Sequence, residues 1–172
     1  MIFWLNGTFG SGKTTTAGLL VERNPRLRLF DPEWVGFMLR ANLADQECTD
    51  FQELPSWRVL TPVVIDEVAR ATGQHLVVVQ TVLVEQYWRE LQDRLLALDH
   101  AVVHVVLEAE ESVMRARIDA DEVEVGARAW RLDHLAPYAA ARPWLAAAAD
   151  RVLDTTDMSP EVAAGAIADL IS

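Results

Sequence analysis

Hydrophobic positions follow two alternating patterns along the chain. Apolar runs of four to seven residues recur, and each is followed by a stretch whose apolar residues are spaced three or four apart. Short runs of this kind predict buried strands, and the three-to-four spacing predicts amphipathic helices. The predicted strands are 2–5, 26–30, 75–80, 101–107 and 151–154, and the predicted helices are 13–23, 34–43, 51–72, 85–98, 110–118, 124–149 and 161–171.

This order of elements predicts a fold class. Strands that alternate with helices form a parallel sheet with helices on both faces, so we expect an α/β protein of three layers with a five-stranded parallel sheet. The run His75–Gln80 fits this arrangement, because it holds three consecutive valines and reads as a strand buried on both faces. Pro62 lies inside the predicted helix 51–72, although a Thr-Pro pair suits a helix start better than a helix middle.

Composition narrows the class of protein. The chain has 172 residues, 51% of them hydrophobic and 24% charged, which suits one globular domain over residues 1–172. The net charge of −11 argues against nucleic acid as a partner. Cys48 is the single cysteine, which excludes an intramolecular disulfide and fits a reducing compartment. No apolar run reaches the ~20 residues of a membrane span, and Met1–Leu5 lacks the basic start of a signal peptide, so we expect a cytoplasmic protein without a transmembrane segment.

A phosphate-binding loop follows the first predicted strand. The segment Gly7-Thr8-Phe9-Gly10-Ser11-Gly12-Lys13-Thr14 matches the pattern G-x-x-x-x-G-K-[ST] in full. Glycines let backbone N–H groups turn around a phosphate, and the helix that follows directs its positive end at the same anion. Lys13, the only lysine in the chain, reaches the β- and γ-phosphates, and the Thr14 hydroxyl is a ligand for Mg²⁺. The motif predicts ATP and Mg²⁺ as cofactors.

Several segments resemble the bacterial tunicamycin-resistance proteins. The resemblance covers roughly the first sixty residues and is carried by Trp4–Thr14, Phe30–Glu33, Gly36–Arg40, Asp50–Gln52 and Pro55–Arg58. These are small P-loop proteins related to nucleoside-monophosphate kinases. The resemblance implies a P-loop NTPase fold, an acceptor-binding region at about 32–72 and a small lid at about 115–142. It implies an ATP-dependent phosphotransferase whose acceptor is a small molecule, a tunicamycin-like nucleoside antibiotic or a related sugar or nucleoside.

The resemblance also implies roles for single residues. Asp31 ends the second predicted strand, where a carboxylate in similar kinases accepts the hydroxyl proton or holds Mg²⁺; the alternative is that Asp31 caps the next helix. Arg40 resembles the arginine that binds the acceptor's phosphate in adenylate kinases; the alternative is that Arg40 lies at the solvated end of its helix. Arg117 is the lid arginine that best fits the family pattern for charge neutralisation at the transferred phosphoryl group. Phe51, Gln52, Trp57 and Arg58 combine aromatic faces with polar tips and suit an acceptor pocket, although core packing explains Phe51 and Trp57 almost as well.

One feature keeps other functions open. P-loop NTPases often carry an Mg²⁺-associated aspartate at the end of a neighbouring strand, but the third predicted strand ends Val78-Val79-Gln80-Thr81. The absence of an acid there favours two alternatives to a kinase, an ATP-binding protein that sequesters the drug without phosphorylating it and a nucleotide-sensing regulator. The oligomeric state does not follow from the sequence.

Overall fold

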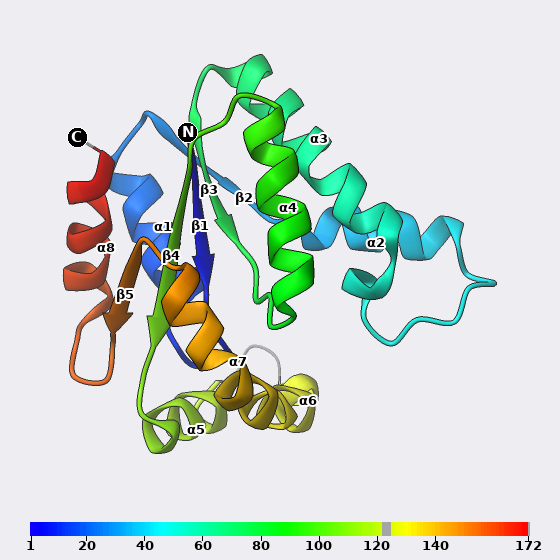
Figure 1. Ribbon diagram of the computed structural model, residues 1–172. Helices are drawn as coiled ribbons and strands as arrows, with labels where there is room; N and C mark the ends of the chain where they lie inside the picture. Colours follow the sequence, from blue (N-terminus) through cyan, green and yellow to red (C-terminus); the bar gives the residue numbers. More distant parts are fainter. Residues whose placement is uncertain (122–124, 172) are drawn as a thin grey trace.

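The protein is a three-layer α/β structure, seen in a computed structural model that describes residues 1–121 and 125–171. Five parallel strands form one sheet in the order β2-β3-β1-β4-β5, as the alternation of strands and helices predicts. The arrowheads in Figure 1 point the same way, so the carboxyl ends of the strands share one edge. The strands are β1 (Ile2–Asn6), β2 (Leu27–Phe30), β3 (His75–Val79), β4 (Val102–Glu108) and β5 (Arg151–Asp154).

Helices cover both faces of this sheet and also its carboxyl edge. Helices α1 and α8 lie on one face, α3 and α4 lie on the other, and α5 and α6 lie beyond the arrowheads (Figure 1). The α-helices are α1 (Lys13–Arg23), α2 (Glu33–Asn42), α3 (Pro55–Thr72), α4 (Glu85–Ala97), α5 (Glu111–Asp119), α6 (Arg128–Asp133), α7 (Leu135–Ala148) and α8 (Pro160–Ala168), and the 3₁₀ turns are η1 (Phe51–Glu53), η2 (Val125–Ala127) and η3 (Asp169–Ile171).

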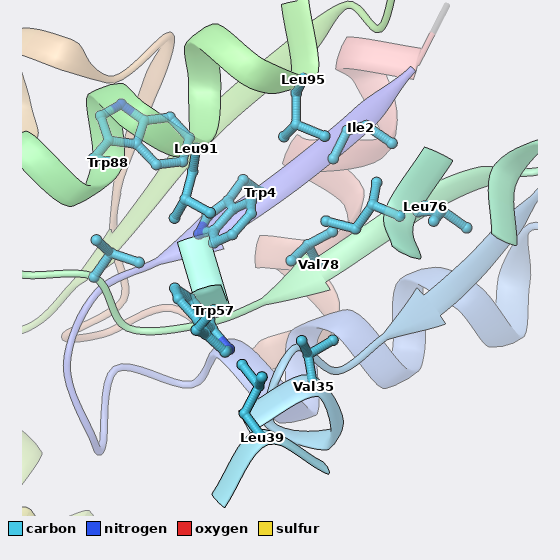
Figure 2. Close-up of a cluster of buried hydrophobic side chains, with 12 residues drawn as sticks. Ile2, Trp4, Val35, Leu39, Trp57, Leu76, Val78, Trp88, Leu91 and Leu95 are labelled. Atoms are coloured by element: carbon cyan, nitrogen blue, oxygen red, sulfur yellow. The ribbon is translucent and has the colours of Figure 1, made fainter. Parts of the chain in front are cut away.

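The central strand β1 is buried along its whole length and divides the core in two. Its side chains alternate, so that Ile2 and Trp4 join one hydrophobic cluster while Phe3 and Leu5 join the other. Trp4 packs edge to face against Trp88 of α4, with ring centroids 5.3 Å apart. Figure 2 shows the same cluster continuing through Trp57 of α3. Close packing of three tryptophans on one face fixes α3 and α4 against the sheet.

The predicted helices 51–72 and 124–149 are each divided in the structure, whereas Pro62 lies inside a helix, as its place in 51–72 predicts. Pro62 lies inside one continuous helix, α3, and starts no helix of its own. Burial of Thr61, Pro62 and Ile65 against the core offsets the ~3 kcal/mol that an interior proline costs. The predicted helix 51–72 is a 3₁₀ turn followed by α3, and the predicted helix 124–149 comprises η2, α6 and α7 with a break at His134.

Within residues 1–121 and 125–171, none of the helices has both the length and the apolar character needed to cross a bilayer. The predicted lid at 115–142 includes residues 122–124, which lie outside the described residues. The described parts of the lid are therefore 115–121, at the end of α5, and 125–142, which comprises η2, α6 and most of α7.

Candidate active site

The loop Gly7–Thr14 connects β1 to α1 at the carboxyl edge of the sheet. Gly7 and Gly10 both have positive φ angles, of 128° and 76°. A Cβ on Gly7 would lie 2.2 Å from the Leu107 carbonyl oxygen, and one on Gly10 would lie 2.6 Å from that of Met114. The loop therefore needs glycine at both positions for its conformation and for its packing against β4 and α5. The Thr16 N–H bonds the carbonyl of Gly12, so the helix starts directly from the loop.

Lys13 is buried inside this loop. Its Nζ donates a hydrogen bond to the Thr8 carbonyl oxygen at 2.8 Å. Burial lowers the pKa of the Lys13 ammonium from 10.5 to about 7, the nearby Glu33 carboxylate opposes this shift, and the Arg131 guanidinium adds to it. The pKa of Lys13 in the phosphate loop thus depends on an acid of α2 and on a cation of α6.

A cavity of about 1020 Å³ opens in front of the loop. Its walls include α2, η1, α5 and α6 and the start of α8, so it joins the phosphate loop to the predicted acceptor region and the predicted lid. Most of the predicted site residues line this cavity: Thr8, Phe9, Gly10, Ser11, Gly12, Lys13, Thr14, Asp31, Arg40, Phe51, Gln52 and Arg117.

Several acids line the acceptor side of the cavity: Asp50 and Glu53 lie around η1, and Asp31 and Glu33 lie just before and at the start of α2. One oxygen of the Asp31 carboxylate accepts a hydrogen bond from the Glu33 N–H at 2.9 Å, which caps the start of α2. Glu33, at the start of that helix, also lines the cavity and interacts electrostatically with Lys13. The capping role that the sequence left open for Asp31 is present, and Glu33 is a site acid that sequence reasoning missed. The sequence does contain a signal for Glu33, because it is a second acid close to the end of the second predicted strand.

Phe51 and Gln52 form the floor of the acceptor side. The Phe51 ring packs so closely on α2 that a Cβ at Gly36 would lie 2.5 Å from its Cγ. The Gln52 amide donates to the Thr81 carbonyl oxygen at 2.8 Å and ties η1 to the loop after β3. Both side chains also line the cavity, as predicted from the sequence.

Trp57 and Arg58, which the sequence predicts to contact the acceptor, do not line the cavity. Trp57 is fully buried, and its indole N–H donates to the Pro32 carbonyl at 3.1 Å. Arg58 forms a 2.7 Å ion pair with Glu90 and also donates to the Gln52 carbonyl oxygen. Both residues lie on the inner side of α3, where they hold α2 and η1 in place behind the site.

Two arginines approach the loop from the lid side. Arg117, in the last turn of α5, donates to the Gly10 carbonyl at 3.1 Å and to the Thr155 carbonyl at 2.7 Å. These bonds join α5 and the segment after β5 to the phosphate loop. Arg131 of α6 pairs with Asp121 and lies 5.5 Å from the Phe9 ring centroid. Sequence reasoning chose Arg117 and missed Arg131, the lid cation whose charge lowers the pKa of Lys13.

The polar groups around the loop fit Mg²⁺ bound together with phosphate. No cluster of three or more His, Cys, Asp or Glu side chains able to hold a metal exists among the described residues. Mg²⁺ keeps several waters and is usually held by one or two protein groups plus phosphate oxygens, so a complete protein cage is not required. Thr14 and Asp31 line the cavity, and Gln80 places a buried side-chain oxygen there that has no partner in the described part of the chain.

The fold and the loop together define a class, the P-loop proteins of the AAA domain family, whose model matches residues 2–132. Within that class the chain belongs to the tunicamycin-resistance proteins. It is 30% identical to the tunicamycin resistance protein of Deinococcus radiodurans, over 99% of this chain and 95% of that chain, with a TM-score of 0.74. The resemblance seen in the first sixty residues thus extends along the whole chain.

Two more distant structures share the fold. A sugar kinase from Janibacter is 17% identical, over 99% of this chain and 93% of that chain, with a TM-score of 0.66. The APS kinase of Mycobacterium tuberculosis, solved with AMPPNP and APS, is 22% identical over 99% and 96% of the two chains, with a TM-score of 0.65. Comparison with curated protein sequences gives no significant match.

Proposed function

We propose that this protein is an ATP-dependent phosphotransferase that phosphorylates a hydroxyl of a tunicamycin-like nucleoside and so confers resistance to the drug. The observation that carries the proposal is one cavity that is lined by the phosphate loop, by Asp31 and by Glu33 of α2. The kinase fold of the distant structures and the name of the Deinococcus relative support the reaction type and the acceptor.

The proposed reaction uses charges that the cavity already holds. The acceptor oxygen forms a bond to the γ-phosphorus, the bond from that phosphorus to the bridging oxygen of ATP breaks, and ADP leaves. Lys13 and Arg131 stabilise the negative charge on the transferred group and on the leaving phosphate. Mg²⁺, bound beside Thr14 and the phosphates, would supply further neutralisation of the same charge. Arg117, which donates to the Gly10 carbonyl of the loop, keeps the loop in position beside α5.

A carboxylate of α2 accepts the proton of the acceptor hydroxyl in this scheme. Asp31 is the residue that the family pattern suggests, and Glu33 is the acid that the electrostatics of Lys13 favour. We assign proton acceptance to Glu33, whose carboxylate interacts electrostatically with Lys13, and the positioning of α2 to Asp31, which accepts a hydrogen bond from the Glu33 N–H. Loss of a general base typically lowers the rate about 10²-fold to 10⁴-fold.

Paired variants separate the two acids. Glu33→Gln is expected to lower kcat at least about 100-fold while ATP binding is retained. Asp31→Asn keeps an oxygen that caps α2, so it is expected to change kcat less than about tenfold, whereas Asp31→Ala loses the cap and about 1 kcal/mol of stability. Steady-state kinetics and urea unfolding measure both effects. If the Asp31→Asn variant is inactive while the Glu33→Gln variant is fully active, the roles of the two acids are reversed.

A binding-only role has one observation in its favour, the uncharged Gln80 that follows β3 where many P-loop enzymes carry an acid. The deciding experiment incubates the protein with Mg·ATP and tunicamycin and looks for one added phosphate by mass spectrometry. Transfer of phosphate supports the kinase. Stoichiometric binding without a mass shift, with resistance unimpaired by Glu33→Gln, would establish sequestration instead.

A further inference from the structure

Helix α2 is apolar on two sides, and only one of them faces the core. Val35 and Leu39 point toward Trp57, as Figure 2 shows. The opposite side carries Trp34, Phe37 and Met38, which are 71%, 46% and 48% exposed. A surface helix normally presents polar side chains to water, so exposed aromatic and methionine side chains in one stripe indicate a binding surface.

This stripe borders a second hollow in the protein, which we call the α2 groove. Its volume is about 520 Å³, within the usual range for small-molecule sites. Aliphatic and aromatic side chains of β2, α2 and α3 form the wall, and Asp31 is the one charged residue described there. The lining residues are Leu29, Phe30, Asp31, Trp34, Val35, Met38 and Val64.

The α2 groove adjoins the active-site cavity. Leu29 and Asp31 line both hollows. Phe37, in the wall of the active-site cavity, meets Trp34 of the groove edge to face, with ring centroids 5.8 Å apart. A ligand whose head lies in the active-site cavity would reach the groove by passing over these side chains, among which Asp31 is the charged one.

We infer that the α2 groove holds an alkyl chain carried by the phosphoryl acceptor, so that the acceptor is an amphiphile whose hydroxyl-bearing head lies beside Glu33. This inference rests on the proposed function and adds the substrate class. The groove lining, as far as the structure describes it, offers no cation, which disfavours a free fatty acid or an anionic membrane surface. A second copy packed on the groove would have to desolvate the Asp31 carboxylate, whereas a ligand's polar head can remain beside it.

The test compares tunicamycin, which carries a fatty acyl chain, with its deacylated core. Binding is measured by calorimetry in the presence of Mg·ADP, over a series of acyl lengths. Burial of each methylene is worth about 0.8 kcal/mol, so each carbon held in the groove should tighten binding about threefold to fourfold. Trp34→Ser and Met38→Ser should each weaken binding of tunicamycin about tenfold or more and leave binding of the deacylated core unchanged.

Leu96→Ser is the matched control, because Leu96 is also exposed (52%) but lies on α4, outside both cavities. It should leave both affinities unchanged. Equal affinity for tunicamycin and its deacylated core would overturn the groove assignment and leave the proposed kinase intact. Chain-length dependence without phosphate transfer would support the groove and overturn the kinase. A dimer in sedimentation that Trp34→Ser converts to monomer, with no dependence on chain length, would show instead that the groove is an interface between copies.

Discussion

Lys13 combines burial with a charge that its function requires. With a pKa of about 7, its side chain is largely neutral above about pH 8 when the loop holds no nucleotide. The phosphates of ATP place negative charge beside Nζ and raise this pKa. Nucleotide binding is therefore coupled to the uptake of a proton by Lys13.

The expected result is close to one proton taken up per ATP at about pH 8 to 8.5, and affinity that falls as the pH rises above about 7. Calorimetry in buffers of different ionisation enthalpy measures the uptake directly. Lys13→Met should abolish the uptake together with most of the affinity. Binding that is independent of pH between about 7 and 9 would contradict the coupling.

The two acids of α2 show where sequence reasoning reaches its limit at this scale. The position of Asp31 at the end of β2 could be predicted, because ligands bind at the carboxyl edge of a parallel sheet. Which of two acids in a turn faces the loop depends on the direction in which α2 leaves the sheet, and Trp57 and Pro32 set that direction through tertiary packing. The sequence pattern contains no local signal for it. Arg131 was missed for the same reason, because its approach to the loop depends on where α6 packs.

Helix α2 must approach η1 closely, and Gly36 makes this possible. We expect Gly36→Ala to destabilise the protein by about 1–3 kcal/mol, because the new Cβ would overlap the Phe51 ring. The displaced ring lies in the acceptor wall, so the KM for the acceptor should rise while the affinity for ATP stays unchanged. Urea unfolding and steady-state kinetics check the two effects.

Gly18→Ala provides the control for this prediction. Gly18 lies on the exposed side of α1, and a Cβ there would meet nothing within 4 Å. The same substitution should therefore stabilise the protein by about 0.5–1 kcal/mol through helix propensity alone. Similar effects of both substitutions would show that the contact between Gly36 and Phe51 is not tight.

At the scale of elements, periodicity was sufficient for the five strands and for the helices that pack on them. It also extended the predicted helices 51–72 and 124–149 across Pro62 and Pro143, and both prolines lie inside helices. Helix propensity disfavours proline inside a helix, because proline has no N–H for the helical hydrogen bond. Burial of the surrounding helix face stabilises the fold by more than that hydrogen bond would. Tertiary packing also explains Trp57. Its polar indole N–H suggested a ligand pocket, but in the structure this N–H donates to a backbone carbonyl in the core.

For the whole molecule, a buried histidine limits stability in acid. His104 stacks on Trp88, with centroids 3.9 Å apart, and burial lowers its pKa from 6.5 to about 4. The unfolded chain binds a proton at His104 below pH 6.5, but the folded protein does so only near pH 4. Stability therefore falls as the pH is lowered from about 6.5 to about 4, by about 3 kcal/mol from this group.

Urea midpoints between about pH 4 and 7 measure this dependence. His104→Gln is expected to flatten it, because glutamine does not titrate, even though the variant starts from lower stability at neutral pH. An unchanged slope in His104→Gln would assign the acid sensitivity to the carboxylates of the protein.

The net charge of −11 does not describe how charge is distributed in the folded molecule. Lys13, Arg40, Arg117 and Arg131 gather around one cavity, as the sequence suggested for the first three, while Arg58 lies outside it. The same wall carries acids, Glu33 and Asp31 among them. The site thus carries charges of both signs, which suits a nucleotide bound together with Mg²⁺. A site with cations alone would discriminate less between one anion and another.

The single lysine gives the protein a built-in chemical reporter. Neutral amines react with acylating reagents and ammonium ions do not, so a lysine with a pKa of about 7 is reactive at neutral pH. No other side chain of the sequence carries such an amine. An acyl label on the side chain of Lys13 would therefore read the occupancy of the loop from one intact-mass spectrum, and saturating Mg·ATP should protect this position. In a mixture of cell proteins, the fraction of this protein that holds nucleotide could be followed by the mass of one peptide.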